Sequence, residues 1–321
     1  MQVDLRRGVF TISIDTELAW GSIHHPDPET YRDYSQERQV VDSLLKLFEK
    51  YQIAATWATV GHLFLNECHL DSGGKHKEVM RPRYPWFDGD WFDADPCTDV
   101  STSPLWYGQD IVQKIQACSV PQEIGSHSFA HFIIGSPQMT PECFESDLSQ
   151  CRLVASDMGV DLKSFVYPRN SLGHVEVLAK NGFLTYRGRM PGQFENTGTV
   201  RRRIMRLADK LAPRGATVVR PEKVCGIWNI PQTYFFSPST GKSRKLPISF
   251  LTYLAGRRIN QAVRFKGLFH MWFHPHDITA DPERSLQGLE NILSRVDKLR
   301  AANLIDNLTM GDLGETLSQE N

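Results

Sequence analysis

Residues 123–131, EIGSHSFAH, combine a short apolar run with two histidines that stand four positions apart. The run is typical of a strand. On one helical turn, side chains at positions i and i+4 face the same way, at about the spacing that two imidazoles need around one ion. An ordinary pair of histidines at the start of a helix gives the same pattern. Other segments must therefore decide whether His127 and His131 bind a metal.

Segments typical of strands alternate with segments typical of helices along the chain. The strand segments are apolar throughout rather than alternating, which favours a parallel sheet covered by helices. The predicted strands are 8–15, 54–60, 123–127, 164–168, 183–188, 226–236 and 267–275. The predicted helices are 35–51, capped by Ser35, and 108–118, 140–159, 173–182 and 281–302.

The polar residues of interest all follow the ends of predicted strands. They are Asp15 and Glu17, His127, Arg169 and His274. An open sheet and a barrel both fit the alternation of elements. Convergence from the carboxyl ends of non-adjacent strands is typical of a barrel, so we expect parallel strands surrounded by outer helices in a (β/α) barrel.

Composition places the chain among globular enzymes. Of its 321 residues, 40% are hydrophobic and 23% are charged. No apolar run is long enough to span a membrane. The N-terminus lacks the apolar core of a signal peptide, so we expect a cytoplasmic protein. The six cysteines form no CxxC pair, and we expect no cysteine metal site or cysteine nucleophile.

Charge is unevenly distributed, although the net charge is −1. Residues 187–266 hold 17 Lys and Arg but only 3 Asp and Glu. A solvated surface matched by acidic segments elsewhere explains this. The sharper hypothesis is a site for the phosphates of a nucleotide-linked or lipid-linked sugar, at the inner membrane surface. No recognition motif for nucleic acid is present.

Four stretches together carry the chemistry. SIDTE (13–17) supplies two carboxylates, HSFAH (127–131) two imidazoles, YPRNS (167–171) a loop, and MWFHPH (271–276) further histidines. In this order they resemble the motifs of the polysaccharide deacetylase (NodB-homology) family. HSFAH matches the family's H-[ST]-x-x-H motif almost literally. The resemblance covers roughly residues 9–277 and implies a distorted (β/α) barrel.

The resemblance also implies roles for single residues. Asp15 is the expected general base, and Glu17, His127 and His131 are the expected metal ligands. The commonest family pattern has a second Asp directly after the first, where this chain has Thr16, so Glu17 follows the D-x-D/E branch. The resemblance assigns the backbone N–H of Arg169 to the oxyanion, and His274 to the general acid, with His276 as the alternative. Trp228 and Arg187 are candidates for the family's Asp/Arg/Trp motif.

The segment 81–107 is rich in aromatic residues and aspartate, which suits a glycan pocket; a small satellite core under a long loop is the alternative. We expect a single catalytic domain over residues 1–321, with loop insertions at 67–105 and 189–225. The residues expected to bind substrate are Trp20, Trp86, Trp91, Trp106, Tyr167 and His276.

The sequence thus predicts a metal-dependent hydrolase that removes an N-acetyl group from a sugar, in surface-polysaccharide or glycoconjugate synthesis. Zn²⁺ is the expected ion, and Co²⁺, Ni²⁺, Mn²⁺ and Fe²⁺ suit the same ligands. Two alternatives remain open at this point. One is hydrolysis of another non-peptide C–N amide bond, and the other is a glycan-binding module on the same fold without catalysis.

Overall fold

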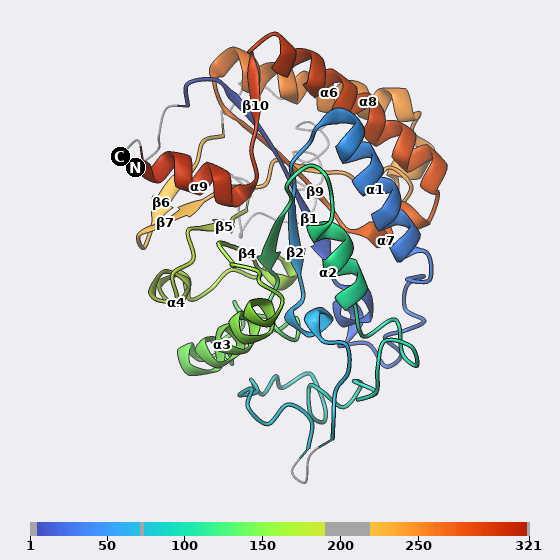
Figure 1. Cartoon of the computed structure of the whole chain (residues 1–321), viewed down its shortest axis with the longest axis vertical. Coiled ribbons are helices and arrows are strands. Elements are labelled where there is room, and N and C mark those ends of the chain that lie inside the picture. Colours follow the sequence, from blue (N-terminus) through green and yellow to red (C-terminus); the bar gives the residue numbers. More distant parts are fainter. Residues whose placement is uncertain (1–4, 71–73, 190–218, 320–321) are drawn as a thin grey trace.

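The computed structural model describes residues 5–70, 74–189 and 219–319 (Figure 1). Its strands are β1 (Gly8–Thr16), β2 (Thr56–Thr59), β3 (Glu123–Ser126), β4 (Ser164–Val166), β5 (Thr185–Arg187), β6 (Glu222–Val224), β7 (Ile227–Asn229), β8 (Tyr234–Phe235), β9 (Leu268–Phe273) and β10 (Ile305–Asn307). Its α-helices are α1 (Glu37–Tyr51), α2 (Gln109–Gln116), α3 (Pro141–Asp157), α4 (Val175–Lys180), α6 (Ile248–Phe265), α7 (Pro275–Thr279), α8 (Pro282–Ala301) and α9 (Met310–Gln319). The 3-10 helices are η1 (Leu18–Ser22), η2 (Gly61–Phe64), η3 (Pro168–Asn170) and η4 (Ser243–Lys245).

One curled sheet holds all the described strands, in the order β6-β7-β5-β4-β3-β2-β1-β9-β8, with β10 beside the start of β1. Every pairing is parallel except the antiparallel pair β6 and β7. β1 is buried along its whole length, as a strand covered on both faces must be. The predicted parallel sheet is confirmed.

The segment from β7 to β8 links the two ends of this sheet. Asn229 pairs with β5, whereas Tyr234 pairs with β9. Between them, Gln232 donates its backbone N–H to the carbonyl of Gly188, and Thr233 donates to the carbonyl of His270. The predicted single strand 226–236 is therefore two short strands, β7 and β8, and the segment between them passes from one side of the sheet to the other. This crossing makes the sheet a distorted (β/α) barrel, as predicted.

Helices cover the outside of the sheet, with α1, α6 and α8 along one side in Figure 1 and α3 and α4 along another. α3 begins as its sequence predicts, because Thr140 accepts a hydrogen bond from the N–H of Cys143 and Pro141 follows it. The predicted cap of α1 is wrong. Ser35 bonds Asp33 instead, and the helix begins at Glu37.

The long segment between η2 and α2 lies at the end of the molecule where β1 and β2 finish (Figure 1). Its described residues form turns, with an isolated bridge between Glu67 and Asp99. This segment corresponds to the predicted insertion at 67–105. Of the other predicted insertion, 189–225, residues 190–218 lie outside the described residues, whereas its last part contains β6. Among the helices that are described, none has both the length and the apolar character needed to cross a membrane.

Candidate active site

Two buried carboxylates stand at the end of β1. Asp15 lies within the strand and Glu17 follows it directly, at the entry to η1. Both side chains are almost fully excluded from solvent. The backbone turns sharply here and brings Gly21 against the Glu17 carboxylate, where an added Cβ would lie 2.0 Å from Oε2. Residues 13–21, SIDTELAWG, thus position both carboxylates, and the absence of a side chain at Gly21 leaves space for the Glu17 carboxylate.

The two histidines of HSFAH lie in a loop between β3 and α3, not on a helical turn. The prediction of a helix at this point is wrong, because Ser128 (φ 65°) and His131 (φ 57°) have left-handed backbones that end regular structure. Buried Asp147 of α3 holds the loop, since its Oδ1 accepts hydrogen bonds from Ser128 Oγ and the N–H of Phe129, both at 2.8 Å. Sequence analysis missed Asp147.

Glu17, His127 and His131 converge. Oε1 of Glu17 lies 3.0 Å from Nε2 of His127 and 3.2 Å from Nε2 of His131. Nδ1 of His127 donates to the carbonyl of Val166 at 2.8 Å, which fixes the proton on that nitrogen and leaves the lone pair on Nε2. Two imidazole lone pairs and one carboxylate oxygen around one point fit a divalent cation.

Asp15 forms a buried ion pair with Arg187, which comes from β5. The two Nη atoms each approach one carboxylate oxygen at 2.6 Å. The guanidinium also lies 4.5 Å from the ring centre of Trp272 on β9 and donates to Ser13 Oγ at 2.9 Å. Arg187 was only one of two candidates for the Asp/Arg/Trp motif. The other, Trp228, lies in a separate apolar cluster and donates to Ser318.

His274 faces both carboxylates from the end of β9. Its Nε2 lies 3.7 Å from Asp15 and 3.6 Å from Glu17, and its Nδ1 bonds Asp277 at 2.7 Å. Burial lowers the pKa of His274, but the negative charges of Glu17, Asp277 and Asp15 outweigh burial and raise it to about 9. The surrounding carboxylates therefore favour the protonated form of this imidazole. Asp277 was not predicted, although His-Pro-His-Asp places it three residues away.

His276, the alternative acid, lies behind His274. The two rings stack at a centroid distance of 4.5 Å. Nδ1 of His276 lies 3.4 Å from Glu37, and its Nε2 contacts Arg32. Both ring nitrogens of His276 thus face Glu37 and Arg32 rather than Asp15 and Glu17. Of the two histidines, His274 is the one that the structure brings to the carboxylates.

Both carboxylates are ionised at neutral pH. Burial raises the pKa of Asp15, but the Arg187 guanidinium and His127 bring it below the usual value. Burial also raises the pKa of Glu17, yet the charge of His274 and the closeness of the imidazoles of His131 and His127 hold it well below the usual value. Burial lowers the pKa of His131, which favours the neutral imidazole that binds metal.

The predicted substrate-binding residues are mostly buried. Trp20, Trp91 and Trp106 pack in the aromatic cluster of the loop segment, and Tyr167 packs among core aromatics. All four belong to the main hydrophobic cluster of the protein rather than to a small separate core, and their faces do not reach the surface in this structure. Trp86 is the exception, with 53% of its surface exposed.

Arg169 lies in η3, directly after β4, with a left-handed backbone (φ 55°) and an exposed side chain. Its charge acts on His24, whose pKa burial and the Arg169 guanidinium lower to about 4. The Arg169 guanidinium is therefore close enough to His24 to act on its protonation.

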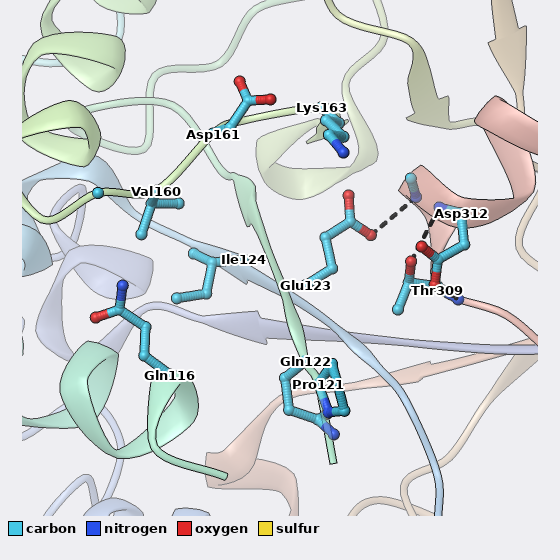
Figure 2. Close-up of a pocket in the computed structure, with 12 residues that line it drawn as sticks. Gln116, Pro121, Gln122, Glu123, Ile124, Val160, Asp161, Lys163, Thr309 and Asp312 are labelled. Atoms are coloured by element: carbon cyan, nitrogen blue, oxygen red, sulfur yellow. Dashed lines mark hydrogen bonds between the residues drawn. The ribbon is translucent and has the colours of Figure 1, made fainter. Parts of the chain in front are cut away.

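A pocket of about 310 Å³ lies elsewhere, at the amino end of β3 (Figure 2). In Figure 2 the Glu123 side chain points toward the start of α9, where it accepts a hydrogen bond from the N–H of Gly311 at 2.9 Å. No predicted site residue lines this pocket. It lies at the opposite end of the strands from Glu17 and His274.

Comparisons with known proteins find no matching family model and no matching curated protein. Solved structures do match. A Mycobacterium smegmatis protein described as a polysaccharide deacetylase has a TM-score of 0.63 and 14% identity, over 99% of this chain and 94% of that one. A Pseudomonas aeruginosa PAO1 protein of the same description has a TM-score of 0.58 and 11% identity, over 98% and 91%.

The Puue allantoinase also matches, with a TM-score of 0.57 and 12% identity over 96% of this chain and 89% of that one. At such low identity these matches establish the arrangement of the chain in space and nothing more. They agree with the mostly parallel, curled sheet and its covering helices. The chain has the fold of the polysaccharide deacetylases.

Proposed function

We propose that this chain is a metal-dependent hydrolase that removes an N-acetyl group from a sugar. The convergence of Glu17, His127 and His131 beside Asp15 and His274 carries this proposal. A metal-binding set, an ionised carboxylate and a protonated imidazole are the groups that amide hydrolysis requires. The deacetylase fold supports the same activity.

Glu17, His127 and His131 are the proposed ligands of the ion. Zinc is the default for two imidazoles and one carboxylate, and Co²⁺, Ni²⁺, Mn²⁺ and Fe²⁺ accept the same ligands. When bound, the ion supplies Lewis acidity for the acyl carbonyl and lowers the pKa of a coordinated water. The buried Nδ1 of His131, which has no hydrogen-bond partner in the structure, leaves this ring less firmly oriented than His127.

Asp15 is the proposed general base and His274 the proposed general acid. Asp15 accepts a proton from the attacking water, while Arg187 keeps its carboxylate in place through two hydrogen bonds. In its cationic form His274 has a proton on each ring nitrogen: Nδ1–H donates to Asp277, and the proton on Nε2 faces the site. It donates that proton to the amine nitrogen as the C–N bond breaks. The backbone N–H of Arg169 is the proposed donor to the oxyanion.

The proposed substrate is an N-acetylated sugar, free or linked to phosphate. Trp86 offers an exposed aromatic face, and its ring lies 6.4 Å from that of His24. Exposed aromatic faces pack against the C–H face of a sugar. Within the basic stretch 187–266 that suggested phosphate, residues 190–218 lie outside the described residues, and the proposal of a phosphate linkage rests on the sequence.

Hydrolysis of another C–N amide bond is the second candidate, and the fold shared with an allantoinase favours it. An acetate-release assay across N-acetylated sugars, run beside ring-opening of cyclic ureides, distinguishes the two candidates. A glycan-binding module without catalysis predicts no turnover of either substrate at any metal concentration.

The ligand and acid assignments are tested by two variants. We expect His131→Ala to lose one bound ion per chain and all turnover. We expect His274→Ala to keep its metal and lose turnover by about 100-fold to 10,000-fold, the usual contribution of a general acid. An His131→Ala protein with the metal content of the wild type would disprove the ligand assignment.

A further inference from the structure

A second cluster of metal-binding side chains lies in the segment between β2 and α2. It contains His62, Cys68, His76 and Asp95. The side chains of His62 and Asp95 are fully buried, and that of His76 is 6% exposed. None of these residues belongs to the candidate active site, and none is used in the proposed reaction.

The ligand atoms of this cluster are spaced like the corners of a tetrahedron. Nε2 of His76 lies 3.1 Å from Nε2 of His62, 3.1 Å from Oδ2 of Asp95 and 3.4 Å from Sγ of Cys68. Oδ2 of Asp95 lies 3.3 Å from His62 and 3.8 Å from Cys68. Zinc bonds of about 2.0–2.1 Å to N and O and about 2.3 Å to S separate tetrahedral ligands by about 3.3–3.6 Å.

Three of the four ligands are held from their other side. Nδ1 of His62 donates to the carbonyl of Trp106 at 3.2 Å, and Nδ1 of His76 lies 3.4 Å from the carboxylate of Glu78. Oδ1 of Asp95 accepts from the N–H of Cys97 at 2.9 Å. Such outer partners fix the orientation of ligands around a metal.

In this arrangement, hydrogen-bond acceptors of the cluster point toward one another. With the proton of His62 on Nδ1, its Nε2 presents a lone pair to the Asp95 carboxylate. The Glu78 carboxylate favours the same tautomer for His76. Lone pairs and a carboxylate oxygen in a buried space repel each other unless a cation lies between them.

We infer that His62, Cys68, His76 and Asp95 bind a structural zinc ion. Four protein ligands form a closed set, as structural zinc sites have. Sulfur with two imidazoles favours zinc over magnesium or calcium, which prefer oxygen. This inference departs from the expectation that no cysteine binds metal. The four ligands could not be recognised as a motif in the sequence, because they are irregularly spaced over the 34 residues 62–95.

The ion fastens the aromatic segment to the loop of the candidate active site. The N–H of His62 donates to the carbonyl of Phe129, which lies between His127 and His131. The Phe129 ring lies 5.8 Å from His62 and 5.3 Å from His76. Loss of the ion frees the segment that carries Trp86 and Trp91 from this support.

Cobalt substitution tests the site directly in the full chain. Thiolate bound to Co²⁺ gives a charge-transfer band in the near ultraviolet, and the candidate active site has no sulfur ligand. We expect the band in the cobalt-loaded wild type and in His131→Ala. We expect Cys68→Ser to lose it, while Cys225→Ser, which removes an exposed thiol, keeps it.

Zinc content gives the second measurement. We expect two ions per chain in the wild type, and one in His131→Ala or His76→Ala. His69→Ala is the matched control, because His69 is close in sequence but its side chain is 78% exposed, and it should keep both ions.

Three results would overturn the site. The first is a wild type with one ion that His131→Ala removes. The second is a cobalt-loaded wild type without the charge-transfer band. The third is a disulfide between Cys68 and Cys97, whose sulfurs lie 2.7 Å apart, found in metal-free native protein. The wild-type measurements decide the question even where a variant does not fold, and they do not depend on the proposed deacetylase activity.

Discussion

Gly21 controls the space beside the Glu17 carboxylate. A methyl group at this position would lie 2.0 Å from Oε2, so Gly21→Ala must displace the carboxylate. We expect weaker metal binding at the candidate active site, by about 10-fold to 100-fold. Titration of the metal-free enzyme with zinc, followed by acetate release, measures the change. Gly256→Ala is the control, because its Cβ would meet only Arg295, at 3.3 Å.

Asp277 sets the pH range over which His274 acts as an acid. The pKa of His274 is raised to about 9, so the proton is present below that pH and lost above it. Asp277→Asn removes one of the negative charges that raise this pKa. We expect the alkaline limb of the pH–kcat profile to move to lower pH, as pH-dependent initial rates will show. Asp306→Asn, an exposed carboxylate on β10, should leave the limb unchanged, and an unmoved limb in Asp277→Asn would contradict the role.

At the residue scale, the sequence predicted the members of the site that form compact motifs. HSxxH and the Asp15–Thr16–Glu17 run can be recognised because their spacing is local. Arg187 could not be assigned, since it meets Asp15 across 172 positions of the chain and only the fold joins them. The sequence did not separate the exposed Trp86 from the buried Trp20, Trp91 and Trp106, because a tryptophan that lines a pocket and one that fills a core look alike in sequence.

At the element scale, Asp147 connects α3 to the loop of His127 and His131. Burial raises its pKa to about 7, so the folded protein binds this proton more tightly than the unfolded chain. The stability that the proton provides is present below about pH 4 and is lost as pH rises to about 7. Asp147→Asn keeps an acceptor for Ser128 and Phe129 without the charge.

We therefore expect the difference in the free energy of unfolding between Asp147→Asn and the wild type to shift in favour of the variant as pH rises from about 4 to about 7. The shift should reach up to about 4 kcal/mol. Urea unfolding of both proteins at either end of this range measures the difference. Asp161→Asn, an exposed change in the loop after α3, is the control. A difference between variant and wild type that stays constant with pH would contradict this account.

Elements with strong periodicity were predicted well, and those with mixed signals were not. α1 buries Val40, Leu44 and Phe48 at helical spacing, which the sequence displays plainly. α6 was not predicted, because several arginines interrupt its apolar pattern. Its buried face consists of Leu251, Ala255, Ile259 and Ala262. The strand 226–236 was predicted whole, but its middle crosses between two partner strands at Pro231, which lacks the N–H for a ladder.

At the scale of the whole molecule, polar side chains cross the inside of the barrel. Arg187 of β5 reaches Asp15 and Ser13 of β1, and Ser13 Oγ bonds His270 of β9 at 2.8 Å. These strands are not all neighbours in the sheet. The sequence predicts a parallel βα arrangement, but it does not display which distant strands face each other. That information lies in the curvature of the sheet.

The Asp15–Arg187 pair therefore joins opposite walls of the barrel, and its loss should affect stability as well as catalysis. Both side chains are buried, with 3% of Asp15 and none of Arg187 exposed. Arg187→Met takes from the buried Asp15 carboxylate its bidentate partner and leaves only the more distant His274, so we expect a loss of about 3–5 kcal/mol in the free energy of unfolding. Asp15→Asn with Arg187→Met should recover part of this stability and none of the activity, because the base is gone. Arg7→Met breaks the exposed pair with Asp306 and should cost less than about 1 kcal/mol. Denaturant unfolding of the four proteins measures these differences, and equal losses for Arg187→Met and Arg7→Met would show that the barrel does not depend on this pair.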